Sequence, residues 1–198
     1  MPKGRLEAFS DGVIAILITI MVLELHIPAG TSWHALGHEL PVLLAYVLSF
    51  VYLGIYWNNH HHMLAAVSRV SGAVLWANLH LLFWLSLIPF STAWMSEHNF
   101  PSIPTGIYGI VLLAAAIAYY ILQTTLLRAE GAQSRLRAAL GSDLKGKISP
   151  LLYCLGIGVA FADAWIGLAV YVGVALIWLV PDRRVERHLA ALNSEPTE

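Results

Sequence analysis

The stretch that decides the fold is residues 5–24, RLEAFSDGVIAILITIMVLE, an apolar run of helical length whose charges gather in its first turns. About 20 apolar residues are enough for one helix to span a bilayer. Ionisable groups inside a membrane helix are costly and usually face protein or water, which makes Asp11, about two turns inside, a functional candidate. A position at the membrane interface would also explain Arg5 and Glu7.

The composition of the whole chain agrees with a membrane protein. Of the 198 residues, 58% are hydrophobic and 12% are charged, whereas soluble domains carry about 25% charged residues. The mean hydropathy is +0.69. A chain this short cannot bury such an apolar surplus in a soluble core, and its single cysteine, Cys154, excludes a disulfide scaffold. We therefore expect an all-α integral membrane protein rather than a soluble enzyme domain or a disordered chain.

The positions of the basic residues predict six transmembrane helices. Residues 6–68, 70–127 and 148–182 contain no Lys or Arg; the first two gaps each hold two spans, and the third holds two only if both are short. Turn-forming residues divide the gaps at 28–31 and 96–104, and a weaker boundary falls at 162–164. The expected spans are 6–27, 36–60, 71–95, 104–127, 148–162 and 164–180, followed by a polar tail at 193–198.

The same residues predict the orientation. With six spans, all eleven Lys and Arg residues fall on one side, whereas the opposite loops carry Glu39, Glu97 and Asp163 and no Lys or Arg. The positive-inside rule then places both termini in the cytoplasm of a multi-pass protein. Because Glu7 and Asp11 interrupt the first apolar segment, we interpret it as a permanent span rather than a cleaved signal peptide.

The first span has two different faces. At about 100° per residue, one stripe of the helix is apolar apart from a threonine, and Asp11 points almost the opposite way. If the stripe faces a symmetry axis, Asp11 faces back into its own subunit and needs a partner there. The stripe consists of Ile16, Thr19, Ile20, Leu23 and Ile27. The candidate partners of Asp11 are His60, His61, Trp57 and Asn78.

These residues resemble a known family. Arg5 with Phe9, Ser10 and Asp11 is similar to the RxxxFSD signature that opens the first helix of the TMEM175 potassium channels. The further matches are Trp57 with His60 and His61, Asn78, and the stretch 87–90. The resemblance covers the chain as a single six-helix repeat, the prokaryotic form, with residues 1–192 as one channel domain.

The resemblance implies a homotetramer in which four first helices line a central pore without the TVGYG filter of conventional potassium channels. Ile16 matches the family's constricting position, Leu23 its upper apolar position, and Thr19 the threonine linked to ion selectivity. Ile20 is another apolar lining candidate. A ring of apolar side chains can stop ions by dewetting, and the threonine hydroxyls could replace part of an ion's hydration shell. The implied function is passive, potassium-permeable cation conduction across a prokaryotic plasma membrane.

The motif residues Arg5, Ser10 and Asp11 are then expected to tie the first helix to the second and third spans. His61 fits the family's histidine, with His60 a close second, and protonation there would couple cytoplasmic pH to the shape of the pore. If replacing His61 leaves the pH dependence of the current unchanged, this hypothesis is wrong.

Alternative functions rest on the same polar residues. The first is a proton-coupled secondary transporter that uses Asp11 with His60 or His61, and the second is a membrane enzyme or scaffold with histidine ligands. Three consecutive histidines at 60–62 point about 100° apart and cannot converge on one metal ion. His34 and His38 have better spacing, although ordinary interfacial histidines are the simpler interpretation.

Few other partners are expected. The chain lacks the GxSxG, HExxH and P-loop motifs, and we expect no enzyme activity, cofactor, metal ion or nucleic-acid partner. The expected partners are potassium and other monovalent cations, further copies of the chain, and membrane lipid, to which the basic segment 128–147 could be attracted. Gly156 and Gly158 are expected to let helices pack closely.

Overall fold

The computed structural model describes residues 2–67, 70–130 and 144–179, and in these ranges the protein is all-helical. The predicted tail at 193–198 and most of the basic segment 128–147 lie outside the described residues. The helices are α1 (Lys3–Val22), α2 (Trp33–His38), α3 (Leu40–Ala65), α4 (Gly72–Ser86), α5 (Ile88–Glu97), α6 (Ser102–Glu130), α8 (Leu144–Ala160) and α9 (Ala164–Leu179).

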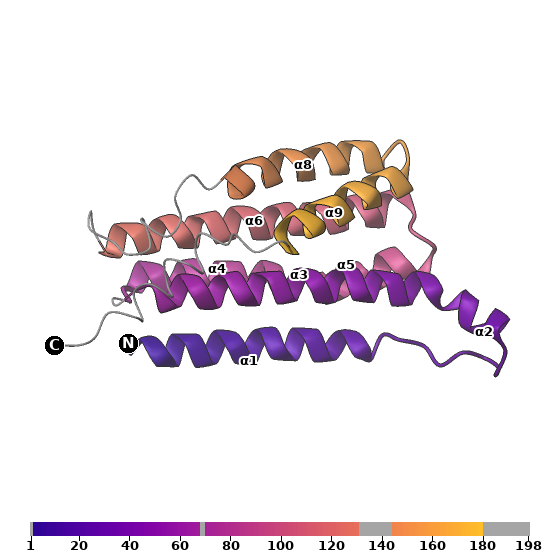
Figure 1. The fold of residues 1–198 in the computed structure, drawn as a ribbon, viewed down its shortest axis with the longest axis horizontal. Helices are drawn as coiled ribbons and strands as arrows, with labels where there is room; N and C mark the ends of the chain where they lie inside the picture. Colours follow the sequence, from indigo (N-terminus) through magenta and orange to yellow (C-terminus); the bar gives the residue numbers. More distant parts are fainter. Residues whose placement is uncertain (1, 68–69, 131–143, 180–198) are drawn as a thin grey trace.

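The long helices run side by side as a layered bundle (Figure 1). α1 forms one edge and packs on α3, α4 and α5, whereas α6 packs on α4, α5 and α8, and α8 packs on α9. The start of α1, the end of α3, the start of α4, the end of α6 and the start of α8 lie at one end of the bundle, which we name the near end (Figure 1). The predicted topology groups these same segments on one side of the membrane.

Three helical segments are long and apolar enough to cross a membrane: Leu40–Ala65, Gly72–Glu97 and Ser102–Glu130. The second combines α4 and α5, and Ala164–Leu179 is a shorter apolar helix. The all-helical, multi-pass prediction is therefore confirmed at this level. The count of six remains a prediction, because α1 carries charges in its first turns and α8 is only 17 residues long, with Pro150 inside it.

The helix boundaries differ from the expected ones in three places. The first helix ends at Val22 rather than 27. The backbone N–H groups of residues 23–25 bond to carbonyl oxygens three residues back rather than four, and the chain then turns toward α3, where His26 Nδ1 lies 3.7 Å from Glu39 Oε2. The second expected span, 36–60, is the short α2 followed by α3, which continues to Ala65. The third, 71–95, is interrupted at Leu87.

The weak boundary predicted at 162–164 is a real helix end. α8 ends at Ala160, and Asp163 caps α9 because its Oδ1 accepts hydrogen bonds from the backbone N–H groups of Trp165 (2.9 Å) and Ile166 (3.3 Å).

The prediction that Gly156 and Gly158 allow close helix packing is right for the first glycine and wrong for the second. A Cβ at Gly156 would stand 2.5 Å from Tyr171 Cε1, so close packing needs this glycine, whereas Gly158 faces open space.

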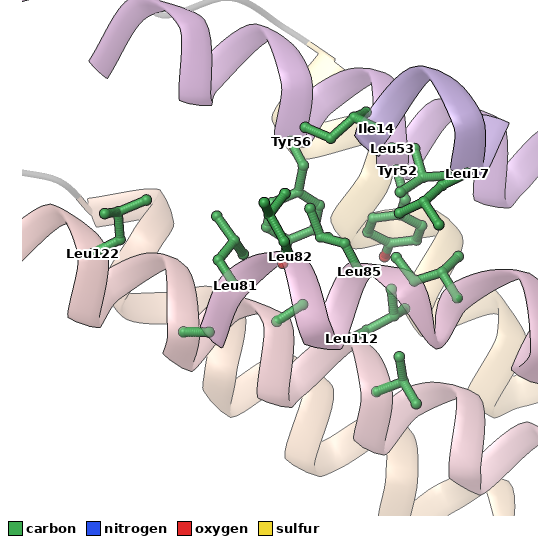
Figure 2. Packing of buried hydrophobic residues seen from close by; sticks show 14 of the residues in the cluster. Ile14, Leu17, Tyr52, Leu53, Tyr56, Leu81, Leu82, Leu85, Leu112 and Leu122 are labelled. Carbon is green, nitrogen blue, oxygen red and sulfur yellow. The ribbon is translucent and has the colours of Figure 1, made fainter. Parts of the chain in front are cut away.

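The core lies where α1, α3, α4 and α6 meet (Figure 2). α1 contributes one stripe of buried side chains, and the middle of α3 contributes aromatic ones that lie against leucines of α4 and α6. The labelled members in Figure 2 are Ile14, Leu17, Tyr52, Leu53, Tyr56, Leu81, Leu82, Leu85, Leu112 and Leu122. This packing fixes which face of α1 is held by its own chain.

Candidate functional site

The carboxylate of Asp11 has a partner in its own chain. Trp57 of α3 donates a hydrogen bond from its indole Nε1 to Asp11 Oδ1 at 3.0 Å. Trp57 is one of the four candidate partners named from the sequence. Because the indole N–H can only donate and an ionised carboxylate only accepts, the pair is matched, and it joins the first half of α1 to α3.

A second, fully buried chain of hydrogen bonds joins α1 to α4 and α3. Ser10 Oγ donates to the carbonyl oxygen of Leu6 at 2.9 Å, and Asn78 Nδ2 donates to Ser10 Oγ at 2.9 Å. Asn78 Oδ1 lies 2.7 Å from His60 Nε2. The side chains of Ser10, His60 and Asn78 are at most 1% exposed.

The donors and acceptors in this series of hydrogen bonds follow from the number of hydrogens that each side chain carries. The only hydroxyl hydrogen of Ser10 goes to Leu6, so Ser10 Oγ must accept from the amide nitrogen of Asn78. The amide oxygen of Asn78 therefore faces His60, and the His60 ring must donate from Nε2. All three hydrogen bonds are therefore donated in one direction: from His60 to Asn78, from Asn78 to Ser10, and from Ser10 to the backbone of α1.

The other motif residues lie at the edge of this network. The ring of His61 is exposed and stacks on Trp57, with ring centroids 6.2 Å apart and planes at 29°. The structure thus distinguishes the two histidines: His60 is in the buried chain of hydrogen bonds, and His61 lies beside the indole. Arg5 and Phe9 are exposed, and within the part of the chain that the structure describes neither joins the network.

Lys3 belongs to the attachment of α1, although the sequence analysis did not single it out. Its Nζ donates to the carbonyl oxygen of Ala65, at the end of α3, at 3.2 Å, and it lies 3.5 Å from Glu7 Oε1. The available signal was the Lys–Glu spacing of four residues, which places the two side chains together on one helix face. Glu7, expected from the sequence to be an interfacial charge, therefore also pairs with Lys3.

The opposite face of α1 is bare. Ile16 is 56% exposed, Ile20 41% and Leu23 80%, and Thr19 is also exposed, whereas Ile14 and its neighbours on the attached face are buried. Leu23 is the C-cap residue, directly beyond the last helical residue. The two faces that the helical wheel predicts are therefore the two faces that the fold creates.

The hydroxyl group of Thr19 is oriented by its own helix. Thr19 Oγ1 donates its hydrogen to the carbonyl oxygens of Ile16 (2.9 Å) and Ala15 (3.1 Å). Because the hydrogen is directed at the backbone, the lone pairs of the oxygen are left for other donors or for a cation. A hydroxyl in this state on an exposed face is an acceptor.

The histidines do not form a metal centre in the described parts of the chain. No group of three or more His, Cys, Asp or Glu side chains in these ranges could hold a metal ion. His34 and His38 contact each other edge to face, with centroids 4.7 Å apart, and Glu39 pairs with His26. The candidate site is thus helix α1, with one face attached to its own chain and one bare, largely apolar face.

These features define the class: a multi-pass helical membrane protein whose first helix is held by its own chain on one side only. Comparison with known proteins gives the family. The family model described as "Endosomal/lysosomal potassium channel TMEM175" matches residues 5–89. A potassium channel of Chryseobacterium sp. (strain P1-3) is 54% identical over 189 residues, which cover 96% of this chain and 98% of that protein.

Two further relatives agree. A potassium channel of Streptomyces collinus is 37% identical over 195 residues, covering 89% of this chain and 91% of that one. The crystal structure of a lysosomal potassium-selective channel TMEM175 homolog from Chamaesiphon minutus superposes with a TM-score of 0.74 at 28% identity, covering 90% of this chain and 96% of that one. The chain belongs to the TMEM175 family.

Proposed function

We propose that this protein is a potassium-permeable cation channel of the prokaryotic plasma membrane, in which four copies of α1 surround a central pore and conduction is passive. The proposal includes six spans per subunit, both termini in the cytoplasm, residues 1–192 as one channel domain, and no enzyme activity. The names of the prokaryotic relatives support the ion, and the family membership supports the architecture. A tag at either terminus should be accessible only from the cytoplasmic side.

The observation that carries the proposal is the bare face of α1. Its own chain covers one face through Ser10 and Asp11 and leaves Ile16 and Ile20 uncovered. The hydroxyl hydrogen of Thr19 is bonded within its own helix, so the oxygen offers its lone pairs on this exposed face. Thr19 with a free acceptor oxygen on this face fits a pore that water and cations enter.

The apolar rings supply the gate. Four copies of Ile16, with Ile20 and Leu23 farther along α1, would form constrictions that exclude water and so stop ions without a charged barrier. The chain contains no TVGYG sequence, so selectivity would fall to Thr19. Hydroxyl oxygens are weak-field ligands, and we therefore expect modest selectivity for potassium over sodium. Opening requires the α1 helices to move apart or rotate.

The polar network of Ser10, Asp11, Trp57, His60 and Asn78 would set the position of each pore helix. The network lies within the first half of α1, so it fixes that part, whereas in the described residues the segment from Ile16 to Val22 contacts the rest of the chain by apolar packing. Apolar packing has no fixed direction and permits small rotations, whereas buried hydrogen bonds do not. We place the motion that opens the pore in this second half.

The experiment is a flux measurement in liposomes under opposed potassium and sodium gradients. The wild type should pass potassium, and Ile16→Asn should pass more because a polar ring stays wet. Thr19→Ala should reduce the preference for potassium over sodium. The matched control is Ile110→Asn, the same substitution at an exposed position of α6, which should behave as the wild type. A folded, correctly oriented wild type and Ile16→Asn variant that both fail to conduct would overturn the proposal.

The alternative function is proton-coupled secondary transport through Asp11 and His60 or His61. One observation favours it: the segment Gly72–Glu97 is interrupted at Leu87, and transporters often break helices near mid-membrane. α1, in contrast, is continuous from Lys3 to Val22. Potassium flux that follows the driving force without any proton gradient supports the channel, and flux that stops when the proton gradient is removed supports the transporter.

A further inference from the structure

Two hydroxyl groups are buried in the bundle without a hydrogen-bond partner. In the described parts of the chain they belong to Thr105 of α6 and Tyr171 of α9, and both side chains are 0% exposed. Neither residue takes part in the attachment of α1 or in its bare face. Buried polar atoms are almost always paired with protein or with ordered water, so each of these two hydroxyl groups needs a physical explanation.

Other buried hydroxyl groups of the same core do have partners. Ser49 Oγ lies 2.6 Å from Thr92 Oγ1 and 3.0 Å from Tyr108 Oη, which joins α3, α5 and α6. The hydroxyl group of Tyr52 donates to the backbone carbonyl oxygen of Tyr171 itself, at 2.6 Å. The backbone of Tyr171 is therefore held by α3, while its own hydroxyl group is an exception among neighbours whose hydroxyl groups are paired.

The position of the Tyr171 hydroxyl group is fixed by two glycines. A Cβ on Gly156 of α8 would lie 2.5 Å from Tyr171 Cε1, and a Cβ on Gly109 of α6 would overlap with the hydroxyl oxygen. The ring thus lies in the space that these glycines leave open, and its hydroxyl group lies directly against α6. Packing on both sides leaves the ring little freedom to turn toward another partner.

Thr105 lies one helical turn before Gly109, on the same face of α6. Cβ positions four residues apart on a helix are about 5–6 Å from each other, so the Tyr171 hydroxyl oxygen lies within about 8 Å of Thr105 Cβ. One water molecule bridges two oxygens that are roughly 5–6 Å apart, because each hydrogen bond measures about 2.8 Å. The two unpaired hydroxyl groups therefore lie within the range of a single bridging water.

The neighbouring side chains from the α8 side are apolar and close. Ile157 Cγ1 would lie 2.8 Å from a Cβ on Gly109, and Phe161 Cζ 3.1 Å from a Cβ on Gly106. These side chains offer no hydrogen-bond donor or acceptor, and helices packed this closely leave room only for a small ligand. A hydroxyl group both donates and accepts, and water is the smallest molecule that does the same.

We propose that one water molecule binds between Thr105 Oγ1 and Tyr171 Oη as a permanent part of the fold. Thr105 is only three residues, or about 5 Å, from the first residue of α6, so water enters from the end of the bundle opposite the near end (Figure 1). The water joins α6 to α9 and so fastens the pair of helices α8 and α9 to the rest of the bundle. This site is independent of the proposed ion conduction.

The direct test is a structure of the full chain in lipid nanodiscs, at a resolution that shows ordered water. We expect density about 2.5–3.0 Å from both hydroxyl oxygens. The density should be lost in Tyr171→Phe and retained in Thr124→Val, which changes a threonine far along the same helix. Direct contact between the two hydroxyl groups, or an empty site in a map that shows other buried waters, overturns the proposal.

Thermal unfolding of the same protein gives an independent test, because the sign of the effect differs. Thr105→Val and Tyr171→Phe each remove one hydroxyl group and add no volume. With a bridging water, each should lower the unfolding midpoint by about 3–6 °C, since the other hydroxyl group loses its partner. The double variant should lower it by less than the sum.

Hydroxyl groups that are truly unpaired would give the opposite result. Replacing them with apolar groups would then raise the midpoint, which overturns the proposal. The matched control is Thr124→Val, at a threonine whose hydroxyl group donates to the carbonyl oxygens of its own helix at Tyr120 and Ile121. It should shift the midpoint by less than about 2 °C.

Discussion

At the scale of single residues, the attachment of α1 depends on groups that have no alternative partners. Ser10, Asn78 and His60 are almost completely buried, and each uses its hydrogen in one direction. A buried polar group left without a partner costs about 1–3 kcal/mol, more than a hydrogen bond contributes when both groups are paired. Removing one of these side chains therefore also leaves a neighbouring polar group without its hydrogen-bond partner.

This cooperation predicts a non-additive double-mutant cycle. Asn78→Leu should lower the free energy of unfolding by about 1–3 kcal/mol, because it leaves His60 Nε2 unpaired in the core. Once Asn78 is gone, Ser10→Ala should cost less than it does in the wild type, since the lost hydrogen bond no longer exists. The measurement is denaturant unfolding in detergent micelles.

The control for this cycle is Ser86→Ala, at an exposed serine of α4 that donates to the carbonyl oxygen of its own helix at Phe83. It should change the stability by less than about 0.5 kcal/mol. Strictly additive effects of Ser10→Ala and Asn78→Leu would contradict the directed chain of hydrogen bonds.

At the scale of helices, α8 and α9 approach so closely that side chains do not fit between them. A Cβ on Gly167 of α9 would lie 2.6 Å from the Cβ and 2.9 Å from the Cα of Ala160, and 3.0 Å from the carbonyl oxygen of Gly156. Two of these atoms belong to the backbone and cannot move aside alone. In a membrane, where the hydrophobic effect does not drive helices together, such close contact is a main source of association.

Gly167→Ala should therefore push α8 and α9 apart and destabilise the fold by about 1–3 kcal/mol. Gly173→Ala, on the same helix and facing open space, is the matched control. It should be neutral or stabilising by up to about 1 kcal/mol, because alanine favours helix over glycine. Thermal unfolding of the two purified variants in detergent distinguishes them. Equal midpoints for both variants would show that the contact does not hold the two helices together.

At the scale of the whole molecule, the proposed pore requires more than one chain. The exposed face of α1 carries Ile16, Ile20 and Leu23 at the edge of the bundle (Figure 1), and a single helix cannot enclose a pore. Symmetric copies complete such a surface by repeating the same contact around an axis. The channel proposal is therefore also a statement about assembly.

Native mass spectrometry of detergent-purified protein should give a complex of four chains of 21.7 kDa each. The assembly should survive Ile110→Asn, which changes an exposed position on α6, a helix other than the three on which α1 mainly packs. A monomer, or a dimer that retains potassium flux in liposomes, would be incompatible with a pore of four α1 helices.

Much of this architecture could be read from local properties of the chain. The absence of Lys and Arg over residues 6–68 and 70–127 predicts long membrane helices, because charge is excluded from hydrocarbon wherever the chain folds. The spacing of residues on α1 predicts its two faces, because helical periodicity is a local property. Asp163 marks a helix end for the same reason. For these features the sequence alone was sufficient.

Other features depend on which helices become neighbours. The choice of Trp57 for Asp11, the different places of His60 and His61, and the attachment of Lys3 to Ala65 each join residues far apart in the chain. Adjacent residues on a helix point about 100° apart, so the rotation of α3 about its own axis decides which of the two histidines faces α4.

The sequence by itself thus determined that this protein is a bundle of membrane helices with a two-faced first helix, because hydrophobicity and helical period are properties of each segment. Only the tertiary structure decided which groups meet across α1, α3 and α4, and that the hydroxyl groups of Thr105 and Tyr171 are buried on either side of Gly109. Those outcomes depend on the rotation and depth at which the helices pack, which no single segment encodes.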